Sequence, residues 1–131
     1  MRHGKILIID DDPDITEAMR VVLENQGYAV RNALDSAEGM DRLKEAKPDL
    51  ILLDVMMRTS QEGFELSREL KHDVQYRDIP ILMLTAVKQK TGLDFKPAAG
   101  DESWLPVEGY LDKPVRPNEL LEKVAGLLDK A

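Results

Sequence analysis

The chain has 131 residues, a hydrophobic content of 43% and a formal net charge of −7, so it can bury one core and we expect a single domain over residues 1–131. The negative charge disfavours binding to nucleic acid or to an anionic membrane surface, and we expect proteins or cations as partners. Cysteine is absent, which excludes a disulfide framework, and no run of about 18 apolar residues could span a membrane, so we expect a cytoplasmic protein.

The first part of the chain alternates strand and helix patterns. Lys5–Ile9 is a short, β-branched apolar run typical of a buried strand, and a run of three aspartates, Asp10–Asp12, follows it. We expect Asp12 or Asp14 to cap the next helix, which Gly27 ends. The apolar face of that helix consists of Ile15, Ala18, Met19, Val22 and Leu23.

A second strand and helix follow. Tyr28–Ala33 is a weaker strand pattern, Asp35 or Ser36 suits the N-cap of the next helix, and Pro48 ends it. The apolar stripe of that helix consists of Ala37, Met40, Leu43 and Ala46. Strand and helix therefore alternate twice, which is typical of a parallel sheet wound with helices.

Leu50–Leu53 is an uninterrupted apolar run, which predicts a strand buried on both faces, and Asp54 stands at its end. In open α/β sheets, ligands bind beyond the carboxyl ends of the strands, so Asp54 is placed for chemistry. For this residue taken alone, the alternative is an aspartate that caps the following turn.

Residues 55–63 show no periodicity and predict a loop. A third helix follows, with apolar positions at Phe64, Leu66, Leu70 and Val74. On this helix we expect His72, which has charged neighbours, to be an exposed surface residue rather than a ligand. Ile81–Leu84 predicts a fourth strand that ends at Thr85 and Ala86, which adds a hydroxyl group to the same edge of the sheet.

Residues 87–108 lose the periodic pattern because glycines and prolines interrupt it, at Gly92, Pro97, Gly100 and Pro106. A loop of this length inside a compact domain is often functional. Order returns at Gly109–Asp112, a short fifth strand that Lys113 and Pro114 follow. Pro117 opens the last helix, whose apolar stripe consists of Leu120, Leu121, Val124, Leu127 and Leu128.

The fold class that we predict is α/β, with a doubly wound, five-stranded parallel sheet. Such a sheet brings the ends of four strands to one edge, which would carry Asp10, Asp11, Asp54, Thr85 and Lys113. Neighbouring carboxylates repel one another, and a hard divalent cation relieves the repulsion. Oxygen ligands without cysteine or a paired histidine favour Mg²⁺ over zinc. A lysine and a threonine beside these carboxylates suit an aspartyl phosphate.

Four segments resemble the receiver domain of the response regulators of two-component signalling. They occur in the order and at the spacing of that family, and together they cover nearly the whole chain: Ile8–Pro13, Leu52–Met57, Ile81–Ala86 and Tyr110–Pro114. The resemblance implies a flavodoxin-like receiver fold with strand order 2-1-3-4-5. It also implies a phosphoacceptor signalling domain rather than a conventional enzyme.

The same resemblance implies roles for the acidic residues. Asp54 would accept a phosphoryl group from a sensor histidine kinase or a histidine phosphotransfer protein. Asp11 would bind Mg²⁺ directly, Asp10 would act through water, and the Asp54 carboxylate and the backbone carbonyl of Met56 would supply further ligands.

Three further roles follow from the resemblance. Lys113 would pair with the phosphoryl oxygens, Thr85 would move toward them, and Tyr110 would turn inward behind Thr85 to couple the site to a surface. Each residue has a structural alternative: Lys113 a solvated turn residue, Thr85 a strand-end hydroxyl, and Tyr110 a half-buried packing aromatic.

The chain also departs from the family pattern. Arg58 occupies the position of the proline that usually follows the two methionines, and residues 87–108 replace a regular fourth helix, so we predict a loop or a short, displaced helix there. Phe95 and Trp104 are candidate partner contacts in that segment. Met56 and Val87, which would flank the phosphoryl group, are apolar and cannot orient a water, so we expect slow loss of the phosphoryl group.

We therefore expect a stand-alone receiver that signals by phosphorylation-dependent protein binding or by a phosphorelay, without contact to nucleic acid or membrane. One alternative is a Mg²⁺-dependent phosphohydrolase that works through an aspartyl phosphate, although Met56 stands where such enzymes commonly place a second aspartate. The other alternative is a pseudo-receiver that binds partners without phosphorylation.

Overall fold

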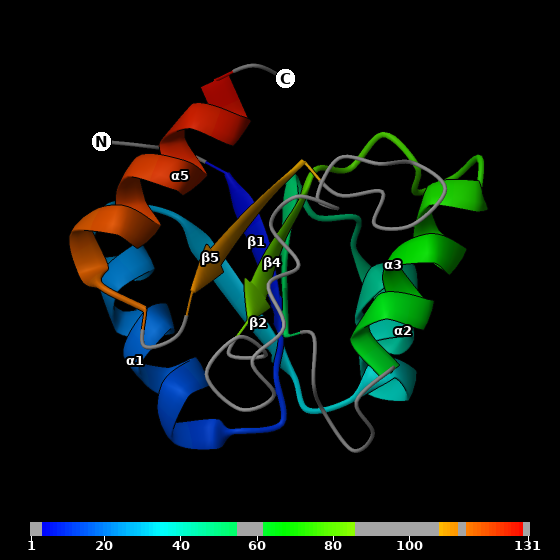
Figure 1. The fold of residues 1–131 in the computed structure, drawn as a ribbon, viewed down its shortest axis with the longest axis horizontal. Coiled ribbons are helices and arrows are strands. Elements are labelled where there is room, and N and C mark those ends of the chain that lie inside the picture. The colour runs from blue at the N-terminus through cyan, green and yellow to red at the C-terminus, as the bar shows by residue number, and fades with distance from the viewer. Residues whose placement is uncertain (1–3, 55–61, 86–107, 113–114, 130–131) are drawn as a thin grey trace.

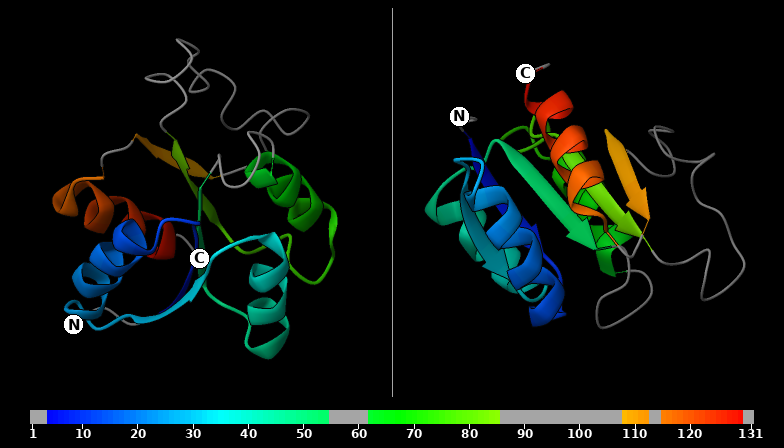
Figure 2. Two further views of the ribbon diagram at one scale, coloured as in Figure 1. Left: turned by 90° about the horizontal axis from the view of Figure 1, so that it is seen from below. Right: turned by 90° about the vertical axis from the view of Figure 1, so that its left-hand side faces the viewer.

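A computed structural model of the chain describes residues 4–54, 62–85, 108–112 and 115–129. Within these ranges, five parallel strands form one sheet in the order β2-β1-β3-β4-β5, and their arrows run the same way (Figure 2). The strands are β1 (Lys5–Ile9), β2 (Ala29–Ala33), β3 (Leu50–Asp54), β4 (Ile81–Thr85) and β5 (Gly109–Asp112). The predicted fold class and strand order are confirmed.

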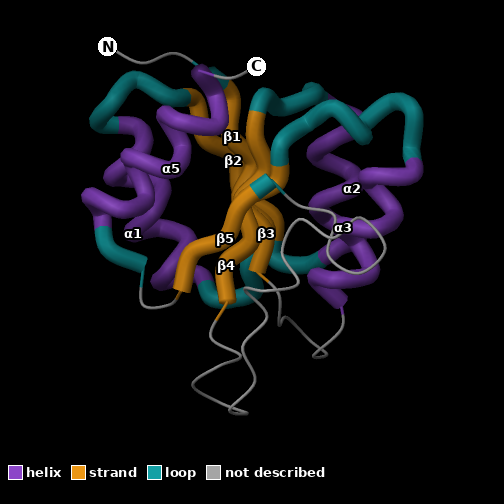
Figure 3. The backbone as a smooth tube through the Cα atoms, turned by 45° about the horizontal axis from the view of Figure 1, so that its top comes forward, coloured by secondary structure: helices purple, strands orange, loops and turns teal. Residues whose placement is uncertain are grey.

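Two layers of helices enclose the sheet. The helices are α1 (Pro13–Glu24), α2 (Ser36–Glu45), α3 (Glu62–His72) and α5 (Pro117–Asp129). Helices α1 and α5 cover one face of the sheet, and α2 and α3 cover the other (Figures 1 and 3). Across the described ranges, no helix has both the length and the apolar character that a membrane crossing requires.

Successive strand residues face opposite helical layers, so the sheet separates two apolar clusters. The cluster toward α1 and α5 includes Ile6, Ile8, Leu50, Leu52, Leu82 and Leu84. The cluster toward α2 and α3 includes Leu7, Ile9, Ile51, Leu53, Ile81 and Met83. All four leucine and isoleucine side chains of β3 are 0% exposed, and each contributes about 1.5 to 3 kcal/mol through burial. The prediction of a central strand buried on both faces is therefore confirmed.

Aspartates fix where the first two helices begin. The Asp12 carboxylate accepts the N–H groups of Asp14 at 2.9 Å and Ile15 at 3.3 Å, which caps α1. The Asp35 carboxylate accepts the N–H of Glu38 at 2.8 Å, which caps α2. Each cap satisfies donors that the first helical turn leaves without an intrahelical partner.

Helix α3 differs from the prediction at both ends. It begins at Glu62, inside the stretch predicted to be a loop, and it ends at His72, which is exposed as predicted. Val74 is expected on the apolar stripe but lies beyond the helix and is 76% exposed. Tyr76 and Ile79, in the connection to β4, are buried against the core instead.

Candidate functional site

Two buried aspartates stand side by side at the carboxyl edge of the sheet. Asp54 is the last residue of β3, Asp10 directly follows β1, and Ile9 pairs with Leu53 in the register of these strands. Asp10 is 0% and Asp54 3% exposed, whereas Asp11 is exposed to solvent. One carboxylate oxygen from each of Asp10, Asp11 and Asp54 lies within 4.8 Å of the other two. The three predicted carboxylates therefore form one group.

Backbone contacts fix the position of Asp10 within this group. Its N–H donates to the carbonyl of Ala33 at 3.0 Å, and its Oδ1 accepts the N–H of Asp12 at 3.0 Å. Because the Asp12 carboxylate caps α1, it takes no part in the group. The run of three aspartates thus divides between a helix cap and two candidate ligands.

The charges of this group favour a divalent cation. Two unit charges at the upper limit of 4.8 Å repel each other by about 3.5 kcal/mol at an effective dielectric constant of 20. The group offers only oxygen donors, and the chain has no cysteine to make a softer site. Oxygen donors of this kind suit Mg²⁺, which commonly uses one or two carboxylates and keeps several waters. The chemistry of the donor set therefore fits the predicted ion.

The comparison with protein families decides the class of the domain. Residues 6–125 match the family model described as the response regulator receiver domain. The chain belongs to this family. Receiver domains are phosphoacceptor signalling domains of two-component systems that take the phosphoryl group from histidine kinases, and they generally hold Mg²⁺ through an aspartate cluster.

Curated relatives of this receiver domain are longer proteins. It is 39% identical over 124 residues to the "DNA-binding dual master transcriptional regulator RpaA" of Synechocystis sp. PCC 6803, covering 95% of this chain and 48% of RpaA. It is 38% identical over 123 residues to the "Phosphate regulon transcriptional regulatory protein PhoB" of Pseudomonas aeruginosa, covering 94% of this chain and 51% of PhoB. The chain thus spans about half the length of these relatives.

Solved structures of similar length share the receiver fold. A putative response regulator from Chloroflexus aurantiacus J-10-fl has a TM-score of 0.83 and 31% identity, and the match covers 98% of this chain and 99% of that one. The Vibrio cholerae chemotaxis protein CheY4 has a TM-score of 0.81 and 30% identity, with coverage of 96% and 99%. Both matches extend over nearly the whole of each chain.

The register of the receiver's sheet locates two further predicted residues. Asp54 pairs with Leu84 in β4, and the next residue, Thr85, pairs with Asp112 at the end of β5. The backbone of Thr85 therefore reaches the edge that carries the aspartates, as predicted. Tyr110 is half-buried and packs against the apolar cluster under α2 and α3. Its part in switching stays a prediction.

Several predicted residues fall outside the described ranges. Lys113 follows the last residue of β5 in the sequence, but its structure is not described. The same holds for Met56 and Val87 and for the candidate partner contacts Phe95 and Trp104. Their roles in the receiver therefore stay predictions.

The structure adds an ion pair that the sequence patterns did not indicate. The Lys71 ammonium, near the end of α3, donates to the Glu108 carboxylate at 2.7 Å and to the carbonyls of Arg77 and Ile79 at 3.1 and 2.9 Å. Glu108 also accepts the N–H of Ile81, the first residue of β4, at 2.8 Å. This network ties α3 and β4 to the residue before β5. Local sequence spacing carries no signal for a contact between residues 37 positions apart.

Proposed function

We propose that Asp54 of this receiver domain accepts a phosphoryl group from a sensor histidine kinase or a histidine phosphotransfer protein. The observation that carries the proposal is the grouping of buried Asp54 with Asp10 and Asp11 within 4.8 Å. In the transfer, an oxygen of the Asp54 carboxylate forms a new P–O bond while the P–N bond of the phosphohistidine breaks. The imidazole leaves with the electron pair of that bond.

Four groups of this chain are proposed to hold Mg²⁺, and one of them is the Asp54 carboxylate itself. Asp11 would contribute a carboxylate oxygen directly, Asp10 would act through water, and Met56 would contribute its backbone carbonyl. When bound, the ion neutralises the repulsion between the carboxylates and the charge of the incoming phosphoryl oxygens. Lys113 pairs with the same oxygens as a fixed cation.

The signal is proposed to leave the site through Thr85 and Tyr110. A phosphoryl group on Asp54 attracts the Thr85 hydroxyl, and Tyr110 follows by moving inward against the cluster beneath α2 and α3. Thr85 pairs with Asp112, and Tyr110 lies two residues before Asp112 on the same strand. This proximity, together with the packing of Tyr110 against the cluster, supports the coupling. Met56 and Val87 supply no group that could orient water, so the phosphorylated state decays slowly and functions in the cytoplasm as a binding signal or relay intermediate.

We infer that the 131 residues themselves bind proteins and not DNA. RpaA and PhoB are named as DNA-binding or transcriptional regulators, but this chain spans only about half of each. The net charge of −7 disfavours direct contact with DNA phosphates. We propose that these residues form a single receiver domain that signals by binding another protein.

Incubation with acetyl phosphate and MgCl₂, followed by intact-mass spectrometry, tests the proposal. The expected result is a mass increase of one phosphoryl group that persists after the donor is removed. Asp54→Asn should abolish it, whereas Asp12→Asn should retain it because Asp12 only caps α1. Continuous release of phosphate would favour the phosphohydrolase, and a protein that stays unmodified would favour the pseudo-receiver.

A further inference from the structure

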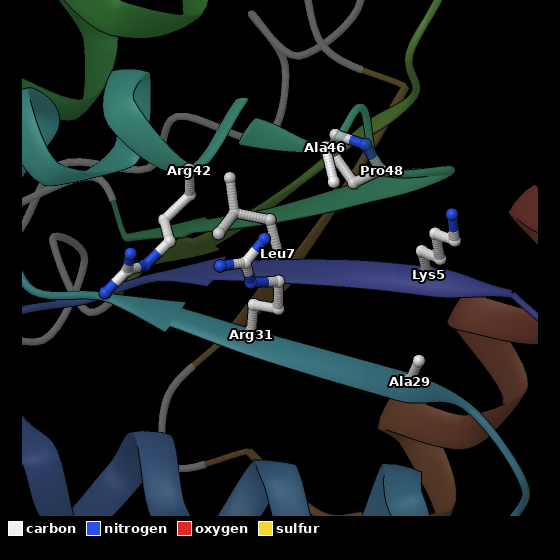
Figure 4. Close-up of a pocket in the computed structure, with 7 residues that line it drawn as sticks. All are labelled: Lys5, Leu7, Ala29, Arg31, Arg42, Ala46 and Pro48. Atoms are coloured by element: carbon white, nitrogen blue, oxygen red, sulfur yellow. The ribbon is translucent and has the colours of Figure 1, made fainter. Parts of the chain in front are cut away.

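A second candidate site lies on the α2 side of the sheet, at the amino-terminal halves of β1 and β2. A pocket of about 170 Å³ opens there between the strands and the end of α2 (Figure 4). Leu7 of β1, Ala46 and Pro48 form its apolar wall. It lies toward the start of β1, whereas the aspartates lie beyond the end of that strand, so it belongs to a separate site.

The local sequence explains why space is left at this position. Helix α2 ends at Glu45, and Ala46 adopts an extended backbone that turns the chain toward Pro48 and β3. The pocket wall at this turn is formed by one methyl side chain and one proline ring, which are too small to fill the gap above Leu7. An apolar body of modest size could therefore bury surface here, since a cavity of about 150 Å³ holds a benzene molecule.

Three cationic side chains surround the apolar wall. Lys5 and Arg31 come from neighbouring strands, in which Leu7 pairs with Arg31, and Arg42 comes from α2 (Figure 4). The Glu45 carboxylate binds the guanidinium groups of both arginines. No carboxylate is among the residues that line the pocket. In a chain with a net charge of −7, this is a local concentration of positive charge.

Hydrogen-bond donors remain available at this site. Arg31 engages Glu45 through Nη2, so its Nε and Nη1 make no hydrogen bond within the part of the chain that the structure describes. The Lys5 ammonium likewise has no ion-pair partner among the described residues, because Asp49 contacts only the backbone N–H of Lys5. Guanidinium and ammonium groups with free donors bind carboxylates strongly.

We propose that this pocket binds a small organic carboxylate with a compact aromatic or branched aliphatic body. The apolar body lies against Leu7, Ala46 and Pro48, and the carboxylate accepts hydrogen bonds from Arg31 and Lys5. Apolar walls with a few convergent polar groups are the usual composition of small-molecule sites. This inference does not rest on the proposed phosphoacceptor function, because none of its residues belongs to the aspartate group.

Titration of the ¹⁵N-labelled protein with sodium benzoate tests the proposal. Saturable amide shifts are expected at the start of β1, in β2 and around Ala46. Benzamide has nearly the same shape without the charge, and we expect it to bind about tenfold more weakly because it loses the charge-assisted hydrogen bonds. The absence of saturable shifts with benzoate, or equal binding of the two compounds, would overturn the proposal.

Two variants separate the apolar and the ionic contributions. Ala46→Leu should fill the pocket and abolish binding of both compounds, while Arg31→Gln should weaken benzoate about tenfold and leave benzamide unchanged. Arg20→Gln is the matched control, since Arg20 is paired with Glu17 on α1, on the opposite face of the sheet. Circular dichroism checks that each variant is folded. If Arg31→Gln and Arg20→Gln bind benzoate equally well, the assignment of the cationic group is wrong.

Discussion

Lys71→Met tests how strongly the ion pair near the end of α3 stabilises the sheet. The Lys71 side chain is 11% exposed, and its ammonium donates to two carbonyls and to Glu108 at distances of 2.7 to 3.1 Å. Methionine keeps most of the apolar stem but removes all three donors. A hydrogen bond to a charged group contributes about 1.5 to 3 kcal/mol, and an exposed ion pair adds at most about 1 kcal/mol. Because water can reach part of the vacated site, we expect a loss of about 2 to 3 kcal/mol in the free energy of unfolding.

Two matched variants isolate the cause of that loss. Glu108→Gln removes the negative charge, but its amide oxygen can still accept the Ile81 N–H that Glu108 now accepts at 2.8 Å. Because Glu108 is 41% exposed, this change should cost at most about 1 kcal/mol. Lys123→Met alters an exposed lysine of α5 and should change the free energy of unfolding by less than about 0.5 kcal/mol.

Urea unfolding followed by far-UV circular dichroism measures all three variants. A loss of this size for Lys71→Met should also lower the melting temperature by roughly 6 to 15 °C in a domain of this length. The slopes of the unfolding curves should stay unchanged, which shows that the native fold is retained. If Lys71→Met costs less than about 1 kcal/mol, or no more than Glu108→Gln, the three donors do not stabilise the sheet as inferred.

Four further variants test the aspartate group, the helix packing and the surface charges. Without magnesium, Asp11→Asn should raise the free energy of unfolding in urea titrations by about 1 kcal/mol, because it removes the repulsion of an exposed, solvent-screened carboxylate. With millimolar Mg²⁺, the variant should no longer be more stable than the unmodified protein. A Cβ on Gly39 would lie 2.8 Å from the buried side chain of Ile9, so Gly39→Ala should lower the free energy of unfolding by about 1 to 3 kcal/mol. A Cβ on Gly126 meets no atom within 4 Å, so Gly126→Ala should raise the free energy of unfolding by about 0.5 to 1 kcal/mol. The hydrogen bond from Arg31, with a smaller contribution from Arg42, lowers the pKa of Glu45. The ionised Glu45 carboxylate therefore stabilises the fold above its unfolded-state pKa, and this stabilisation is lost as the pH falls through the lowered folded-state pKa. Arg31→Gln should raise the pKa of Glu45 in an NMR titration, and an unchanged value would show that Arg31 is not the cause.

The central strand and the aspartates could be predicted from sequence because their signals are local. Four consecutive apolar residues fit only an element buried on both faces, and Asp54 ends that run. The topology of a doubly wound sheet then places Asp10 beside Asp54, since parallel strands end at one edge. Grouping three carboxylates therefore required no knowledge of distant contacts.

The start of α3 could not be predicted from local patterns, and its first residue makes a tertiary contact that those patterns do not encode. Glu62 and Gly63 open this helix although glycine is a poor helix former. The Glu62 carboxylate accepts the N–H of Ser36 in α2 at 2.9 Å, which links the first turn of α3 to a distant segment. Similarly, Val74 continues the helical spacing of its apolar neighbours, but the chain turns after His72 and buries Tyr76 instead.

The contacts of Glu108 also constrain how the chain returns to the sheet after β4. The chain leaves β4 at Thr85, yet Glu108 bonds to Ile81 at the opposite end of the same strand. Thr85 and Glu108, the two described residues that bound this connection, therefore lie at opposite ends of β4. Because backbone and side-chain hydrogen bonds hold Glu108 to Ile81, described residues alone align the start of β5 with the start of β4, and this alignment carries through to the pairing of Thr85 with Asp112 at the edge that holds the aspartates.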